Sequence, residues 1–389
     1  MTTASPAAPA RPAGAPFRIR EIPSGESLRP FIDLSWTLNA ADPNWVPPLR
    51  MVIGQVLDRK KHPFHQHADV AYFLAERGGK PVGRIAAVVN HQYNRFHDDR
   101  TGFFGFFECV DDAEVARGLV EAAAEWLRAR GRDRMLGPMN FSTNDELSSP
   151  GTLIDGFDRP PLVMMSHNPP YYGALMDGAG LAKSKDLVAY WIPSPQPTER
   201  VKQGLARLTR RIGITIRSAR MKDLKEEVRR VQEVYNAAWS RNWGFVPMTE
   251  AEFNFMAREM RPVVDPDLVL LAEKDDGEPI GFLLCLPDLN RAFIKIRDGR
   301  LFPFGALKFL WHRRGIDTLR TLTLGMKPGY QHLGLGTAMY THALGVAASK
   351  GYVAGEASWI LEDNHEMRLA MDKLGASAYK TYRVYERAL

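Results

Sequence analysis

The sequence predicts a mixed α/β fold made of two tandem copies of one unit, with helices packed on a mixed sheet. Three observations predict it. Short segments recur at a nearly constant offset, and each half reads as an antiparallel hairpin followed by alternating strands and helices. The length of 389 residues also exceeds the usual size of a single hydrophobic core, which favours two domains.

The repeat rests on pairs of matching positions that lie 196 to 198 residues apart. Each half has an upstream strand, an Asn-Trp pair followed by proline, a hairpin with a glycine after its turn, and an Asn that opens a late helix. The matching positions are Arg20 and Arg217, Asn44 and Asn242, Glu76 and Glu273, Gly83 and Gly281, and Asn168 and Asn364.

A proline-rich stretch marks the boundary between the copies, because proline removes backbone donors and stiffens a linker. We expect a disordered Ala/Pro tail at 1–16, a first domain at 17–192, a linker at 193–200 and a second domain at 201–389. In the second copy we expect helices at 222–239, 336–349 and 365–374, and strands at 268–273, 279–287, 319–326, 353–360 and 378–387.

A glycine-rich junction in the second copy carries the clearest chemical signal. A strand-like run ends at Pro328-Gly329, Gln331 is followed by Gly334 and Gly336, and an amphipathic helix then begins. Glycines let a backbone approach a ligand closely, and the free amides of a helix N-terminus favour anionic phosphate. The spacing fits neither a P-loop nor a dinucleotide-binding turn. The junction therefore predicts a pyrophosphate site, with a ligand-free turn as the alternative.

This Gln-x-x-Gly-x-Gly spacing, preceded by a proline and a tyrosine, resembles the acyl-CoA motif of the GNAT acyltransferase superfamily. The segment 364–375 resembles the later block of that family, in which an Asn opens a helix that runs into Leu-Gly. The resemblance implies transfer of an acyl group from acyl-CoA to an amine, without a covalent enzyme intermediate. The cofactor-binding positions that it implies are Leu324, Gly325, Met326, Gln331, His332, Leu333, Gly334, Leu335, Gly336, Thr337 and Asn364.

The first copy departs from this pattern at the same junction. Its strand and helix are joined by Cys109-Val-Asp-Asp112, which has no Gly-x-Gly and whose carboxylates would repel a pyrophosphate. We therefore expect a degenerate copy that does not bind CoA. Its polar, glycine- and proline-rich insertions at 137–146 and 155–161 suggest a shaped loop near an acceptor site, with a plain surface loop as the alternative.

Proton transfer has several candidates. Many members of the family place a tyrosine acid seven residues after the helix-opening Asn, but here that position is Met371, so the acid is left unassigned. Glu356, on the strand before the later block, is the first candidate base, and Glu362, His332 and His365 follow. For each of them a structural or solvated role is the alternative.

Composition narrows the possible partners, cofactors and cellular location. The net charge of +6 suits an anionic cofactor but is modest, and the aromatics sit among aliphatics, so nucleic acid is not an expected partner. The two cysteines favour a reducing cytoplasm over a disulfide framework. No metal site is expected, because the histidines at 62, 65 and 67 lie in a proline-containing loop without a cysteine. No run reaches the length of about 20 apolar residues that a membrane-spanning helix needs.

The segment 297–314 interleaves aromatic and aliphatic residues with Arg and Lys. That composition is typical of an element lying on an anionic membrane, here the inner membrane, and a core helix with a basic rim is the alternative. The tandem arrangement and the segment 236–247 also resemble GNAT-type proteins that include the bacterial ceramide synthases, which N-acylate a sphingoid base. This implies a lipid amine acceptor. The alternatives are an acetyl-CoA-dependent N-acetyltransferase of a small molecule or protein, and a non-catalytic regulator that binds acyl-CoA or lipid.

Overall fold

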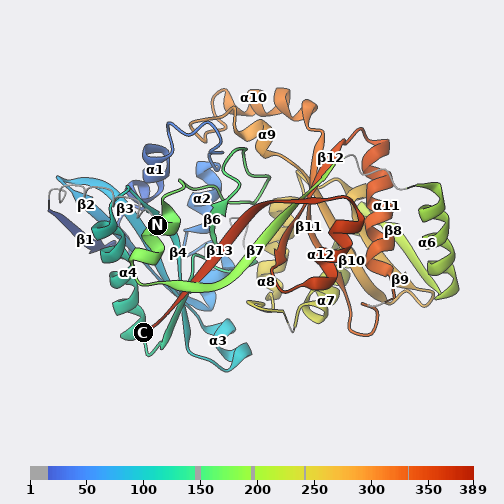
Figure 1. Cartoon of the computed structure of the whole chain (residues 1–389), viewed down its shortest axis with the longest axis horizontal. Coiled ribbons are helices and arrows are strands. Elements are labelled where there is room, and N and C mark those ends of the chain that lie inside the picture. Colours follow the sequence, from blue (N-terminus) through green and yellow to red (C-terminus); the bar gives the residue numbers. More distant parts are fainter. Residues whose placement is uncertain (1–15, 145–149, 194–197, 241, 332) are drawn as a thin grey trace, which may run out of the picture.

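The computed structural model describes residues 16–144, 150–193, 198–240, 242–331 and 333–389. A single 13-stranded mixed sheet runs the length of the molecule and is covered by helices on both faces (Figure 1). The strands are β1 (Phe17–Glu21), β2 (Ala68–Arg77), β3 (Lys80–Asn90), β4 (Thr101–Cys109), β5 (Arg134–Gly137), β6 (Thr152–Asp155), β7 (Ala182–Pro193), β8 (Ile214–Ser218), β9 (Val269–Lys274), β10 (Pro279–Pro287), β11 (Thr318–Met326), β12 (Ala354–Leu361) and β13 (Ser377–Ala388).

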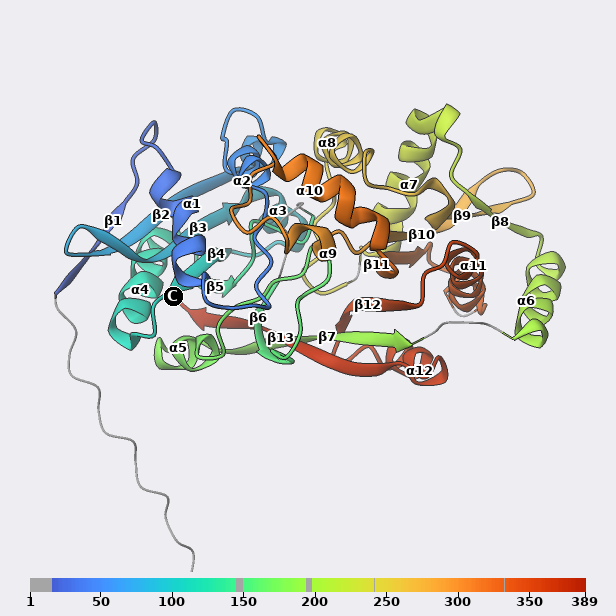
Figure 2. The same ribbon diagram turned by 90° about the horizontal axis from the view of Figure 1, so that it is seen from above.

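The helices lie in two layers. The first-copy helices are α1 (Arg29–Leu38), α2 (Arg50–Val56), α3 (His91–His97), α4 (Ala113–Arg128) and α5 (Tyr172–Gly178). The second-copy helices are α6 (Glu199–Arg211), α7 (Leu224–Ala238), α8 (Glu250–Met260), α9 (Asn290–Phe293), α10 (Gly305–His312), α11 (Leu335–Ser349) and α12 (His365–Lys373). Figure 2 shows α1, α2, α7 and α8 on one side of the sheet and α4, α5, α11 and α12 on the other.

The two halves repeat each other in strand register, which confirms the prediction of two tandem copies. In β1–β2, Phe17 lies opposite Arg77, and in β8–β9 the corresponding pair is Ile214 and Lys274. The repeated charges also make the same contact. Arg20 lies 3.0 Å from Glu76 in the first copy, and the equivalent Arg217 lies 2.6 Å from Glu273 in the second.

The last strand of each copy is exchanged between the copies. Strand β13, from the end of the chain, lies between β5 and β7, and β7 in turn pairs with β12. Tyr385 of β13 lies opposite Gly137 of β5 and packs in the apolar cluster formed by α4, α5 and the first-copy strands. The two cores are therefore joined through the middle of one sheet.

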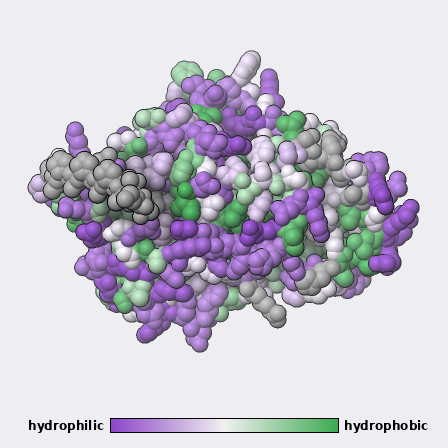
Figure 3. Space-filling model, in the orientation of Figure 1, coloured by the Kyte–Doolittle hydropathy of each residue, from purple (hydrophilic) through white to green (hydrophobic). Residues whose placement is uncertain are grey.

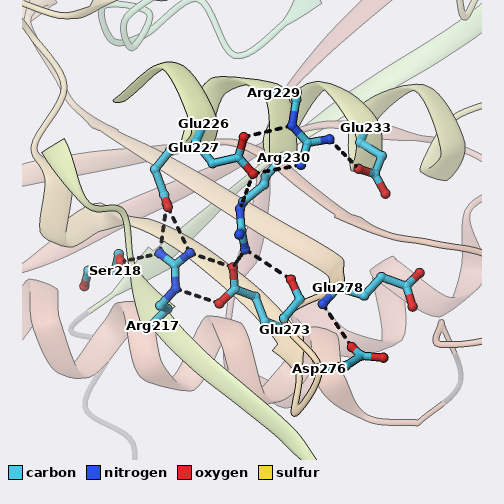
Figure 4. Close-up of polar contacts among 11 residues, drawn as sticks. Arg217, Ser218, Glu226, Glu227, Arg229, Arg230, Glu233, Glu273, Asp276 and Glu278 are labelled. Atoms are coloured by element: carbon cyan, nitrogen blue, oxygen red, sulfur yellow. Dashed lines mark hydrogen bonds and ion pairs between the residues drawn. The ribbon is translucent and has the colours of Figure 1, made fainter. Parts of the chain in front are cut away.

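An ion-pair network holds α7 against the edge of the second copy (Figure 4). The Arg217 guanidinium donates two hydrogen bonds to Glu227 of α7, at 2.8 and 2.9 Å, and two to Glu273 of β9, at 2.7 and 2.6 Å. Arg230 donates to the same Glu273. Such bidentate pairs fix orientation as well as distance, so the network sets the position of α7 over the sheet.

Candidate active site

Two parallel strands separate in the second copy and open the sheet. Strands β11 and β12 pair only from Thr318 opposite Ala354 to Thr321 opposite Ala357. Beyond that point β11 continues to Met326 paired with β10 alone. The edge of β11 that faces β12 is therefore unpaired along the segment where the sequence placed Leu324, Gly325 and Met326.

The glycine-rich junction leads from this open edge into an uncapped helix. Helix α11 begins after Gly334, whose φ of 75° is left-handed, and no described side chain caps it. A Cβ at Gly334 would lie 3.3 Å from the Leu208 side chain of α6. In the first copy the equivalent helix α4 is capped by Asp112, which accepts from the amides of Glu114 and Val115. Only the second junction thus offers free amides to an anion.

The other residues of the predicted cofactor site surround this junction. Gln331, Leu333 and Thr337 are exposed, Leu335 is buried, and Gly336 is half-buried at the start of α11. Asn364 accepts from the amide of Met367 and caps α12. His332 lies outside the described residues. All of these assignments remain predictions.

Gly325 has a packing role that the motif did not reveal. A Cβ at this position would lie 2.0 Å from the Trp239 ring, so the indole packs directly on the backbone of β11. Trp239 follows α7 and also lies 5.6 Å, centroid to centroid, from Phe282 of β10. The glycine therefore lets the end of α7 approach the strand closely.

A cavity of about 390 Å³ lies under α7 and α8 and reaches the open ends of β11 and β12. Leu324 and Asn364, both predicted to bind the cofactor, are in its wall. Most of its other lining side chains are apolar, among them Val228, Val231, Phe253, Met256, Met260 and Phe282. A cleft of this size and lining suits a ligand with a large apolar part.

Polar groups also face this cavity, among them Asn144, Tyr235, Ser358 and the predicted Asn364. Asn144 comes from the first copy, within the insertion that suggested a loop near an acceptor site, and its amide donates to the Val246 carbonyl. The Tyr235 hydroxyl of α7 donates to the Asn144 carbonyl oxygen. Ser358 of β12 also lines the cavity, and no sequence motif pointed to it or to Tyr235.

Glu356 is buried beside this cavity and is held by three groups. Its carboxylate accepts from the Ser358 hydroxyl at 2.6 Å and from the Tyr379 hydroxyl, and it lies 3.5 Å from the Arg320 guanidinium. Arg320 also donates to the Ser358 oxygen at 3.0 Å. Glu356 therefore reaches the cavity only through Ser358. Its role as a base remains a prediction.

Two other proton-transfer candidates, Glu362 and His365, are not part of the cavity wall. Glu362 accepts from the Lys183 ammonium and from the amide of Asp186, and His365 is exposed at the start of α12. Met371, at the position of the family's tyrosine acid, is fully buried in the core.

The three neighbouring histidines are engaged with other parts of the chain. His65 contacts the Val56 carbonyl, and burial lowers its pKa to about 4. His67 lies 2.9 Å from Glu252 of α8, and His62 lies edge-on to Phe255. They link the first copy to α8.

The first copy has a cavity of its own, of about 410 Å³. Trp45 lines it, and the repeat equivalent Trp243 lines the cavity of the second copy. Its base holds a buried ion pair between Arg84 and Glu108, 3.2 Å apart. The duplication thus preserved a hollow in both copies, whereas the open helix N-terminus is found only in the second.

Comparisons with known proteins agree with this geometry. Residues 228–376 match the model of the acetyltransferase (GNAT) family. A Caulobacter vibrioides protein named bacterial ceramide synthase is 40% identical over 374 residues, covering 93% of this chain and 95% of that protein. Protein YghO of Escherichia coli is 34% identical over 379 residues, 95% of each. A tandem GNAT protein from the clavulanic acid pathway shares the fold, with a TM-score of 0.56 at 13% identity over 96% of this chain and 98% of that one.

Proposed function

Because the chain is an N-acyltransferase of the GNAT family, we propose that it transfers a long acyl group from acyl-CoA to the amine of a lipid, as in the N-acylation of a sphingoid base. The observation that carries the proposal is the apolar cavity beneath α7 and α8. A small polar acceptor would leave most of that wall in contact with water, whereas a hydrocarbon chain would cover it. The relative named bacterial ceramide synthase supports the same acceptor class.

The donor is proposed to lie across the junction between β11 and α11. The free amides at Leu335, Gly336 and Thr337 would hold the diphosphate of the coenzyme, and the glycines leave room for it. The unpaired edge of β11 would place an amide near the thioester oxygen, where negative charge develops. Bound there, acyl-CoA supplies an electrophilic carbonyl carbon at the open end of the sheet.

The acceptor amine must lose a proton as it attacks, and Ser358 is placed to take part in that transfer. A hydroxyl has one proton and two lone pairs. The Ser358 proton is directed to Glu356, its oxygen accepts from Arg320, and the Met165 sulfur lies 3.4 Å from that oxygen. The second lone pair of the oxygen is proposed to accept from an amine in the cavity. We assign Ser358 the role of proton acceptor from the amine, with Glu356 receiving the serine proton in the same step.

The first experiment compares donors and acceptors with the purified protein. Palmitoyl-CoA and acetyl-CoA are each offered with a sphingoid base and with a small polar amine, and products are identified by mass spectrometry. We expect an N-acylated lipid only with the long-chain donor and the lipid amine. Turnover restricted to acetyl-CoA would overturn the lipid assignment, and acyl-CoA binding without any product would leave the chain a non-catalytic regulator.

A second experiment tests the proton route. Ser358→Ala should lower kcat by about 100-fold or more, the range typical of lost acid-base assistance, while acyl-CoA binding is kept. Ser349→Ala, at the exposed end of α11, is the matched control. An unchanged kcat and pH profile in Ser358→Ala would exclude the serine from the proton path.

A further inference from the structure

Helix α10 turns its apolar face toward solvent. Leu307, Leu310 and Trp311 have the i, i+3, i+4 spacing of one helix face and are 66%, 51% and 71% exposed. Phe302 and Phe304, just before the helix, are 79% and 68% exposed. This arrangement is the reverse of an ordinary surface helix, whose apolar stripe faces the core. The alternative of a core helix with a basic rim is therefore wrong for this segment.

Hydrogen bonds to the first copy hold the segment that precedes α10. The Trp36 indole donates to the Arg297 carbonyl at 3.0 Å, and the Arg297 guanidinium donates to the Trp45 carbonyl at 2.6 Å. The amide of Arg50 donates to the Gly299 carbonyl at 2.9 Å. These contacts tie the insertion to α1 and α2 of the first copy, so the apolar side chains are presented by a fixed support.

Cations surround the apolar residues. The segment 299–314 contains Arg300, Lys308, Arg313 and Arg314 and no acidic residue, and all four are exposed. Within the described part of the chain, none of the four forms an ion pair. On the upper rim of Figure 3, where Figure 1 places α10, hydrophobic and hydrophilic atoms are mixed. Apolar groups that enter a bilayer, flanked by cations that meet anionic headgroups, are typical of a membrane-surface element.

The charge pattern favours a lipid surface over a second copy of the chain. A symmetric dimer would place this patch against itself, and the four cations of each copy would then face the same four cations. An anionic bilayer instead neutralises them. No described helix is long and apolar enough to span a membrane, which leaves contact at the surface as the mode that this patch supports.

The inner side of α10 connects the patch to the cavity wall. Phe309 stacks on Phe293, with ring centroids 5.1 Å apart. Both rings pack in an apolar cluster that includes Met260, Leu284 and Leu322, which line the cavity of the active site. Packed apolar side chains therefore join the inner side of α10 to the cavity wall.

We propose that the segment 300–314 docks the enzyme on an anionic lipid bilayer, with the exposed face of α10 in the headgroup region. Membrane binding follows from the exposed patch alone. The corollary that α10 admits the acceptor lipid to the cavity rests on the proposed function.

Vesicle sedimentation tests the docking surface in the full-length protein. We compare vesicles of phosphatidylcholine alone with vesicles in which part of it is replaced by phosphatidylglycerol. The variants are Phe304→Ser/Leu307→Ser/Trp311→Ser and Lys308→Glu/Arg314→Glu, and the control is Val353→Ser, which removes a residue that is 57% exposed elsewhere. Wild type and control should sediment with the anionic vesicles, and each test variant should lose about tenfold or more of that affinity. Salt should weaken wild-type binding.

Three outcomes would overturn the proposal: no wild-type binding to anionic vesicles, equal binding by the test variants, or a wild-type oligomer that the triple variant converts to monomer without any vesicle binding. Activity measurements test the corollary separately from vesicle binding. On a lipid amine embedded in vesicles the triple variant should lose turnover, but on a short-chain sphingoid base free in solution it should match wild type. If wild type binds vesicles yet acylates neither amine, the proposed function fails and the docking surface stands.

Discussion

At Gly334 the backbone takes a left-handed conformation that a side chain resists. The φ of 75° and the Leu208 side chain, 3.3 Å from a Cβ built there, leave little freedom for substitution. Gly334→Val should therefore distort the junction and weaken acyl-CoA binding by about tenfold or more, since strain at such a site costs about 1–3 kcal/mol. Calorimetric titration with palmitoyl-CoA measures the change.

Gly345 provides the control, because it lies within the same helix and a Cβ there would meet no atom within 4 Å. Gly345→Ala should bind as wild type and melt slightly higher, as expected for alanine in a helix interior. Equal affinity of Gly334→Val and Gly345→Ala would remove the junction from the cofactor site.

Asp288 links the copies and makes stability depend on pH. Burial raises the pKa of its carboxyl from 3.8 to about 7, although it accepts a hydrogen bond from the Val163 amide at 2.9 Å. A raised folded-state pKa means that the folded protein keeps a proton that the unfolded chain releases. The contribution to stability is therefore full below about pH 4 and is lost as the pH rises through about 7.

Asp288→Asn keeps the acceptor oxygen and removes the titration. Urea unfolding at pH 5 and pH 8 should show that the variant gains stability relative to wild type at the higher pH. If the stability difference between the variant and wild type is the same at pH 5 and pH 8, Asp288 does not titrate between these pH values.

At the scale of elements, the position of α7 depends on its ion-pair network. Arg217→Met should lower the free energy of unfolding by on the order of 3 kcal/mol, because Glu227 and Glu273 would keep charges with too few partners in a largely dry site. Arg229→Met removes an exposed arginine from the same helix, which pairs with Glu226 and Glu233, and should leave the melting temperature nearly unchanged. Equal losses of stability in both variants would show that burial does not account for the strength of the ion-pair network.

Local patterns predicted most elements of the second copy. The strand expected at 279–287 is β10 as found, and the helix expected at 336–349 differs from α11 by one residue. Both segments are largely apolar and are flanked by glycine or proline. Helix α8 differs from these segments. Helix α8 contributes Phe253, Met256 and Met260 to the cavity wall. Its position over the cavity depends on strands that are distant in the sequence, so its own sequence could not predict that position.

The candidate site also combines residues that the sequence could indicate with residues that only the fold brings together. Gly334 and Gly336 belong to a short motif that can be recognised in the sequence before the fold is known, and their role in cofactor binding remains a prediction. Ser358, Tyr235 and Asn144 come together from β12, α7 and a first-copy loop, so their proximity exists only after folding. Gly325 is intermediate, because the sequence marked it as a cofactor-binding position, which remains a prediction, while its close contact with Trp239 required the packed structure.

The two copies share the middle of one sheet because their last strands are exchanged. The sequence indicated two equivalent copies, and in equivalent copies each final strand has two similar places to pair. The choice between them is made by the fold of the entire chain. Loop closure over such distances also costs entropy before any contact is gained. The domain limits at 192 and 201 therefore remain a prediction of sequence, since in space the copies share β7 and β13.

This exchange makes the first core sensitive to a residue near the C-terminus. Tyr385→Ala removes a ring that is 1% exposed among α4, α5 and the first-copy strands, and should destabilise by on the order of 3 kcal/mol. Native-state hydrogen exchange should show the loss of protection in β5, which pairs directly with β13. Met371→Ala, equally buried but in the second-copy cluster, should raise exchange around α12 and β12 first. If Tyr385→Ala leaves β5 as protected as in wild type, the two cores are independent and the strand exchange is wrong.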